Sequence, residues 1–112
     1  MEADKNKKTT FDGGVTEADI AKWKAKHRKV TRIDAVDGDE LHIGYFKRPS
    51  LETLKAATKV AQSDEVKGGE IIFDGCWLGG SEHIREDSVL FMSVSKQLAG
   101  MIVSAKSSLK NL

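Results

Sequence analysis

Two short stretches of alternating apolar and polar residues, joined by a tight turn, most constrain the fold of this chain. Asp37-Gly38-Asp39 lies between them, and its glycine supplies the positive φ that such a turn requires. The pattern predicts an antiparallel β-hairpin with one apolar face. A lone hairpin is only marginally stable in water, so we expect helices to cover that face. The alternating apolar positions are Ile33, Ala35, Leu41, Ile43 and Tyr45.

A helix is predicted before the hairpin, over residues 17–28. Thr16 has the side chain of an N-cap, and acidic residues follow it in the first turn, where they favour the positive end of a helix. Ile20, Trp23 and His27 recur at helical spacing and form one narrow apolar face. The lysines of this segment are expected on the opposite side.

Two further helices are predicted after the hairpin. Pro49 cannot donate to a strand ladder, so the second strand should end there, and Ser50 is a candidate N-cap for a helix over residues 51–62. Asp64 is a second candidate N-cap, and apolar residues recur at helical spacing up to Trp77. We expect Gly79-Gly80 to end that helix as a C-cap.

The last helix is predicted to be long. Asp87 or Ser88 opens it, and about 24 residues, on the order of 36 Å, carry a continuous apolar stripe. A domain of this size cannot cover that length, so part of the stripe is expected to meet another chain. The stripe consists of Phe91, Val94, Leu98, Met101, Ile102, Ala105, Leu109 and Leu112.

Taken together, the pattern predicts an α+β fold, mainly helical, with about four helices and one antiparallel β-hairpin packed on them. With 112 residues, we expect residues 1–14 to be a flexible N-terminal arm and residues 15–112 to be a single globular domain. The N-terminal residues lack the apolar core of a signal peptide, and no apolar run is long enough to span a bilayer. One cysteine also fits a reducing compartment, so we expect a cytoplasmic protein without a membrane partner.

Charge is unevenly distributed although the net charge is only +1. The segment 64–87 holds seven acidic residues against Lys67 and Arg85, a local charge of −5. A basic run lies earlier in the chain. Such segregation can steer a partner of opposite charge or favour self-association, or it can simply be solvated surface. The basic run consists of Lys22, Lys24, Lys26, Arg28, Lys29 and Arg32.

No catalytic group is predicted. The stretch FDGCWLGGSEHI, residues 73–84, gathers the only cysteine, a tryptophan and a histidine around glycines. Cys76 shares a helix face with Phe73 and Trp77, and no cation is placed to lower the pKa of its thiol. We therefore expect Cys76 to be a buried, inert core residue. An enzyme that uses Cys76 with His83 is the alternative.

No cofactor and no metal site is predicted either. The sequence has no phosphate-binding glycine pattern of the P-loop or dinucleotide type. His27, His42 and His83 are scattered, and no metal-ligand spacing is present. The acidic residues around Gly38 are explained by the turn.

Nucleic-acid binding is the strongest chemical alternative. The basic run lies beside Trp23, and further lysines precede it, so both could contact phosphates. Against this, the isoelectric point of about 7.8 is low for a nucleic-acid-binding domain. No helix-turn-helix, zinc-finger or RNP pattern is present. We therefore retain a small nucleic-acid-binding protein using residues 22–32 as the alternative function.

From residue 30 onward, the order of motifs resembles a known family. A hairpin closes on YFKRPS, the helix LETLKAATKVAQSD follows, and GGEIIFDGCWLGGSEHIREDSVLF leads to a long terminal helix. This order resembles the tail assembly chaperones of long-tailed bacteriophages and prophages. The segment 17–28 and the lysine-rich arm are not part of the pattern. The matching positions are Tyr45, Phe46, Arg48, Pro49, Cys76, Trp77, Leu78, Gly79, Gly80, Asp87, Leu90 and Phe91.

The resemblance implies binding instead of catalysis. Such chaperones coat the long helical tape-measure protein and help recruit tail-tube subunits, so the implied partners are the tape-measure and tail-tube proteins in the cytoplasm of the bacterial host. Recognition of a helix in an apolar groove, together with self-association, fits this role. The residues we expect at partner contacts are Tyr45, Phe46, Arg48, Met101, Leu109 and Leu112.

Overall fold

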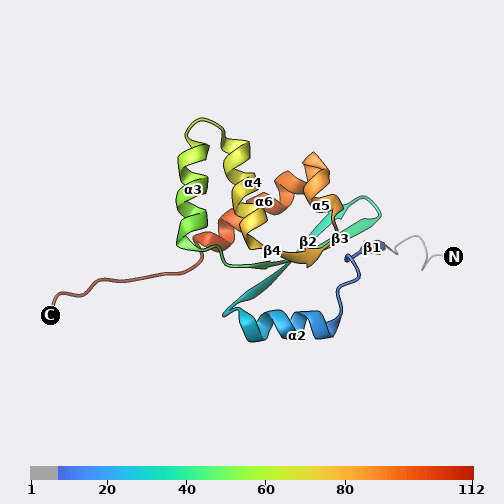
Figure 1. Cartoon of the computed structure of the whole chain (residues 1–112), viewed down its shortest axis with the longest axis horizontal. Helices are drawn as coiled ribbons and strands as arrows, with labels where there is room; N and C mark the ends of the chain where they lie inside the picture. Colours follow the sequence, from blue (N-terminus) through green and yellow to red (C-terminus); the bar gives the residue numbers. More distant parts are fainter. Residues whose placement is uncertain (1–7) are drawn as a thin grey trace.

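The structure, a computed structural model, describes residues 8–112, and over these it is an α+β fold with five helices and a four-stranded mixed sheet (Figure 1). The predicted class is confirmed, but the sheet is larger than one hairpin. In chain order the elements are β1 (Thr9–Phe11), α2 (Glu17–Lys26), β2 (Val30–Asp37), β3 (Glu40–Lys47), α3 (Leu51–Ala61), α4 (Glu65–Cys76), β4 (Trp77–Gly80), α5 (His83–Glu86) and α6 (Ser88–Ile102).

Strand β3 is the centre of the sheet. It pairs antiparallel with β2 along one edge, which confirms the predicted hairpin. Its other edge is shared by two short strands: β1 pairs parallel with the first half of β3, and β4 pairs antiparallel with the second half. In this register Phe11 lies opposite His42, and Gly80 lies opposite Gly44. Neither short strand was predicted, because three or four residues carry too little alternation to be recognised.

Both faces of β3 are buried, whereas β2 exposes Arg32, Asp34 and Val36 on one face, so the prediction of a single apolar face was wrong for the central strand. Ile33 pairs with Gly44, and residues that pair across a ladder project from the same face, whereas Ile43 and Tyr45 project from the other. Figure 1 shows α2 below the sheet and α3–α6 above it. The Trp23 ring of α2 lies 5.6 Å from the ring of Tyr45 and covers the second face.

The main core lies between the first face of the sheet and helices α4, α5 and α6. At its centre the Phe46 ring lies 5.3 Å from the ring of Phe73 and 5.4 Å from that of Trp77. Burying a side chain of this size contributes about 1.5–3 kcal/mol, so this cluster holds the helices to the sheet. The buried members are Ile33, Ala35, Phe46, Phe73, Cys76, Ile84, Leu90, Phe91, Val94 and Leu98.

The four longer helices begin where the sequence predicted. The Thr16 and Asp19 side chains form a capping box at α2, and Ser50 accepts a hydrogen bond from the backbone N–H of Thr53 at α3. Asp64 does the same for Lys67 at α4, and Asp87 accepts from two backbone N–H groups at α6. These caps are predictable because they satisfy amide groups only two or three residues away.

The end of α4 differs from the prediction. The helix stops at Cys76, Trp77 is its C-cap, and the chain continues directly into β4. Gly79-Gly80 is therefore part of a strand and not a helix cap. Gly80 has a φ of +137°, and a Cβ there would lie 2.8 Å from the Cα of Gly44 and against the Ile43 carbonyl oxygen. Close approach of the backbone to β3, and not helix termination, requires this glycine.

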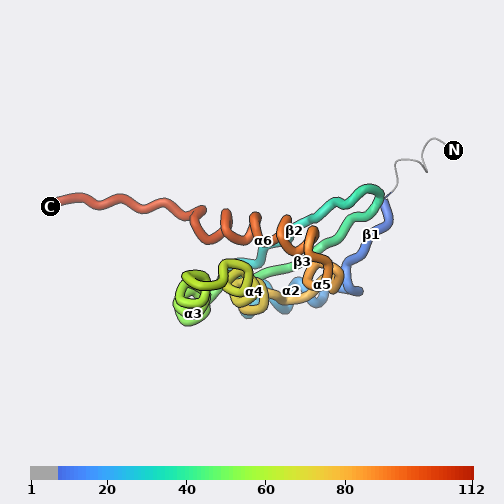
Figure 2. Tube along the Cα trace, turned by 90° about the horizontal axis from the view of Figure 1, so that it is seen from above, coloured from blue at the N-terminus to red at the C-terminus, as the bar shows by residue number. Residues whose placement is uncertain are grey.

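The last helix is shorter than predicted. α6 has 15 residues and ends at Ile102, not about 24 residues, and residues 104–112 have neither helix nor strand. Figures 1 and 2 show this segment leaving the body of the molecule in an extended path. Leu109 is 86% exposed there. Most helical stability comes from packing an apolar face, so a stripe that meets no surface does not stay helical in this chain. The short α5, one turn after Glu82, was also missed.

The predicted arm over residues 1–14 is also corrected in part. Residues 1–7 lie outside the described residues, whereas Thr9–Phe11 form β1 on the edge of the sheet. Gly13 follows with a φ of +65° in the turn toward α2. Over residues 8–112, no helix is long and apolar enough to cross a membrane.

Candidate functional site

The single thiol is buried in the main core. Cys76 is fully buried among core residues, as the sequence predicted. Burial raises the pKa of the Cys76 thiol to about 11, and the nearby Lys47 opposes this shift only in part. At neutral pH the thiol is therefore protonated, which is the opposite of what a nucleophilic cysteine needs. The ring contacts of His83 are with Phe11 and His42, at centroid distances of 5.3 and 5.5 Å.

A buried imidazole network was not predicted. His42 Nδ1 lies 2.8 Å from Ser81 Oγ, and His42 Nε2 lies 2.9 Å from Glu40 Oε1. A carboxylate only accepts, so Nε2–H donates to Glu40, and in the neutral imidazole Nδ1 then accepts from the Ser81 hydroxyl. The Phe11 ring stacks on the imidazole at 4.7 Å with an interplanar angle of 8°. The arrangement is a serine–histidine–carboxylate chain at the junction of β1, β3 and β4.

Burial decides what this chain of hydrogen bonds can do. Ser81 and His42 are each only 2% exposed, so the serine hydroxyl is not presented to a substrate. The network instead ties the turn after β4 to the centre of the sheet, where an unpaired polar group would cost about 1–3 kcal/mol. The spacing of Glu40 and His42 on one strand was visible in the sequence. Ser81 lies 39 residues away, and no local pattern indicates that it meets His42.

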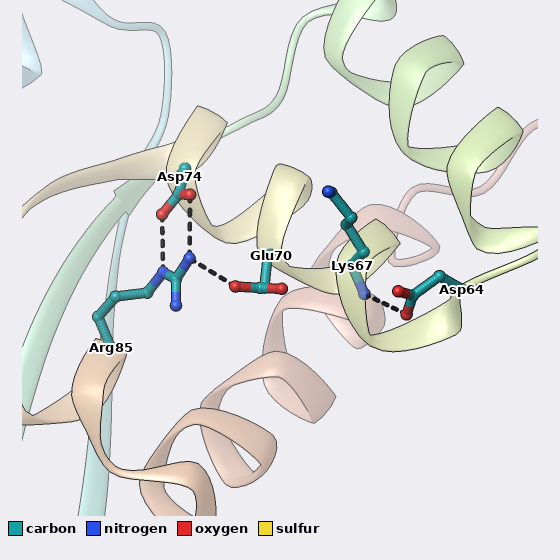
Figure 3. Close-up of polar contacts among 5 residues, drawn as sticks. All are labelled: Asp64, Lys67, Glu70, Asp74 and Arg85. Carbon is teal, nitrogen blue, oxygen red and sulfur yellow. Dashed lines mark hydrogen bonds and ion pairs between the residues drawn. The ribbon is translucent and has the colours of Figure 1, made fainter.

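The acidic segment is partly structural. Arg85 of α5 donates to Asp74 Oδ1 at 3.0 Å and to Glu70 Oε2 at 2.8 Å (Figure 3). Its guanidinium also lies 5.3 Å from the centroid of the Phe91 ring. Hydrogen bonding to Asp74, and then to Glu70, raises the pKa of Arg85. The pairs are partly exposed, so each contributes at most about 1 kcal/mol. The cluster fastens α5 to α4.

The basic run lies across the sheet from that acidic cluster. Lys22, Lys24 and Lys26 are exposed on α2, which covers the opposite face of the sheet from α4 (Figure 1). Arg32 is already paired, with Nε 2.7 Å from Asp34 Oδ1. Trp23 is half-buried against Tyr45 and Gly79, so its ring is not presented for stacking on a base.

The predicted partner residues fall into two groups. Phe46 is fully buried and Tyr45 is 8% exposed, so in this structure neither presents a surface to another chain, and their assignment to partner contacts is corrected. Tyr45 and Phe46 were misassigned because both faces of β3 are covered. The remaining positions are more accessible: Arg48 is exposed, Met101 is half-buried, and Leu109 and Leu112 are exposed.

The structure brings Arg48 and Met101 together. They line a hollow of about 130 Å³ between the end of β3, α3 and the end of α6, together with Pro49, Leu54, Ile102, Ser104 and Ala105. Ile102 also faces a second hollow of about 100 Å³ between α4 and α6. We call this second hollow the α4–α6 groove; its lining is Gly69, Ile72, Ser95, Leu98, Ala99 and Ile102.

The outward side of α6 also exposes apolar side chains. Val89, Met92 and Val103 are all more than half exposed and recur at helical spacing along it. Lys96 is the only charged residue among residues 88–102. An exposed helix face normally carries several charges, so the end of the molecule around α6 is a candidate surface for binding an apolar partner.

Among residues 8–112, no group of three or more histidine, cysteine or acidic side chains is arranged to hold a metal ion. Comparisons with models of known protein families, with curated proteins and with solved structures find no match to this chain.

Proposed function

We propose that this chain is a non-enzymatic tail assembly chaperone of a long-tailed bacteriophage or prophage, which binds the tape-measure protein and aids assembly of the tail tube in the cytoplasm of the bacterial host. The ordered set of motifs across residues 30–112 carries the proposal. The pairing of Tyr45 with Gly79 and of Phe46 with Trp77 supports it, because the two strongest motifs form one packed unit.

Binding is assigned to the surface around α6. The outward face exposes Val89, Met92 and Val103, and the hollow lined by Arg48 and Met101 lies at the end of the helix. An amphipathic helix recognises such a surface through apolar residues at helical spacing. A long helical client offers many such segments. We assign Arg48 and Met101 to the rim of this surface, where a guanidinium can pair with acidic groups of the client.

Co-expression with the tape-measure protein of the same phage genome tests the proposal. We expect a stable complex that co-purifies at low salt. Met92→Glu should weaken it, because a charge would be buried against the client. Val36→Glu is the matched control, since Val36 is equally exposed but lies at the hairpin end of β2. Failure of the wild-type chain to co-purify, or equal loss with both variants, would contradict the proposal.

A nucleic-acid-binding protein is the second candidate. The exposed lysines of α2 support it, whereas the covered Trp23 ring and the pairing of Arg32 with Asp34 do not. This candidate requires binding to duplex or single-stranded DNA or RNA that weakens steeply as salt rises. A flat titration at low salt, with micromolar protein, would eliminate it.

A further inference from the structure

The lining of the α4–α6 groove has the composition of a binding site for an apolar partner. Five of its six lining residues are glycine, alanine or larger aliphatic residues, and no charged side chain is among them. The sixth, Ser95, has a buried Oγ without a hydrogen-bond partner among the described residues. Buried hydroxyls are normally paired, so an orphaned one in an apolar groove indicates a missing polar contact.

Residues 103–112 are a segment whose apolar side chains lack a surface to cover them. They continue the apolar stripe of α6, with Ala105, Leu109 and Leu112 three and four residues apart, yet they have no secondary structure. Both leucines are exposed. The segment contains neither glycine nor proline, so nothing in its sequence prevents a helix. A helix would form there if a partner surface covered the stripe.

We infer that residues 103–112 of a second copy of this chain dock as a helix in the α4–α6 groove. Ala105 to Leu112 in a helix spans about 10.5 Å, so it can lie beside α6 over the stretch from Ser95 to Ile102 that lines the groove. Docking places apolar side chains over the aliphatic lining and brings polar groups within reach of Ser95 Oγ.

Charge complementarity supports the same occupant. The segment carries Lys106 and Lys110, beside its apolar stripe when helical. Glu65 is exposed and lies four residues before Gly69, on the side of α4 that faces the groove. Of the three acidic residues of α4, Glu70 and Asp74 already pair with Arg85, so Glu65 is the one that can meet a lysine of the segment. A basic amphipathic segment is therefore attracted to this helix.

Docking within one chain is disfavoured by the path of the backbone. Ile102 itself lines the groove, and the next residues turn away: Ser104 donates to the Met101 carbonyl at 2.7 Å and, with Ala105, faces the hollow beside Pro49. The segment then leaves past α3 (Figure 1). Folding back onto α4 needs a loop of about two to five residues, which leaves about five to eight residues for the docked helix, so a helix supplied by a second copy can be longer.

The test uses two variants that each remove one half of the contact. The double substitution Leu109→Ser with Leu112→Ser removes the apolar side chains of the segment without touching the folded core. Gly69→Leu fills the groove, because Gly69 is part of its lining. The substitution should be tolerated, because a Cβ at Gly69 meets no atom within 4 Å. Gly100→Leu is its matched control: Gly100 is equally open but lies on the other side of α6. Ala99→Lys is a second groove variant should Gly69→Leu fail to fold.

Analytical ultracentrifugation of the chain alone, over a wide range of concentration, measures the outcome. We expect reversible self-association, weakened about 100-fold or more by the leucine variant and by Gly69→Leu, and unchanged by Gly100→Leu. Mixing the two defective variants should restore association, because one supplies the groove and the other the segment. No self-association of the wild-type chain, no effect of either variant, or no recovery on mixing would overturn the inference. None of these measurements involves the tape-measure protein, so they stand apart from the proposed function.

Discussion

Gly80→Ala is the most informative single substitution in this fold. The structure places Gly80 in β4 with a φ of +137°, a conformation that other residues rarely adopt. An added Cβ would lie 2.8 Å from Gly44 Cα and against the Ile43 carbonyl oxygen. Neither neighbour is a flexible side chain, so β4 must move away from β3.

The expected cost follows from these two effects. Strained backbone contributes about 1–3 kcal/mol, and loss of strand pairing adds to it, so we expect destabilisation of about 2–4 kcal/mol. A fall in Tm of roughly 10 °C or more should result. This is a large share of the roughly 5–15 kcal/mol that stabilises an ordinary domain.

Gly69→Ala is the matched control, and it should shift stability in the opposite direction. Gly69 lies inside α4, and a Cβ there meets nothing within 4 Å. Alanine should therefore stabilise the fold by up to about 1 kcal/mol through helix propensity. Urea denaturation with a fluorescence readout measures both variants. A Gly80→Ala protein as stable as the wild type would refute the strand assignment of residues 77–80.

Three further predictions concern side chains. Cys76 should resist alkylation at neutral pH until the protein is denatured. Its folded pKa of about 11 exceeds the value of 9.0 expected in the unfolded chain. The free energy of unfolding should therefore be unaffected by this thiol below pH 9 and fall between pH 9 and 11, by at most about 1.4 kcal/mol per pH unit. Cys76→Ala should abolish that slope. Arg85→Met should cost no more than about 2 kcal/mol, and a double-mutant cycle with Asp74→Asn should show a coupling that weakens with salt. Trp23→Ala should destabilise the fold by about 2–3 kcal/mol, because the ring packs on Tyr45 at the second face of the sheet; an unchanged Tm would contradict that packing.

Local signals in the sequence predicted most of the helices and the hairpin. Thr16, Ser50 and Asp64 cap backbone groups within three residues, so their effect is contained in a short window. β1 and β4 escaped prediction because their identity as strands comes from the open edge of β3, far away in the sequence. The same limit explains the last helix, whose periodicity extends beyond the surface that stabilises it.

Of the candidate site residues, the sequence predicted correctly the one whose burial follows from its own apolar helix face. Cys76 was expected in the core and lies there. Phe46 was misassigned because both faces of β3 are covered, which the alternation of the hairpin alone does not reveal. The hydrogen bond between His42 and Ser81 joins residues 39 positions apart, and only the folded chain brings them together.

Hydrogen exchange of the chain with and without the tape-measure protein tests the central claim most directly. We expect the client to slow amide exchange in α6, around the exposed Val89 and Met92, and to leave the exposed face of α2 unchanged. Protection confined to α2, or no change anywhere at saturating client, would contradict the claim that this end of the molecule binds another polypeptide.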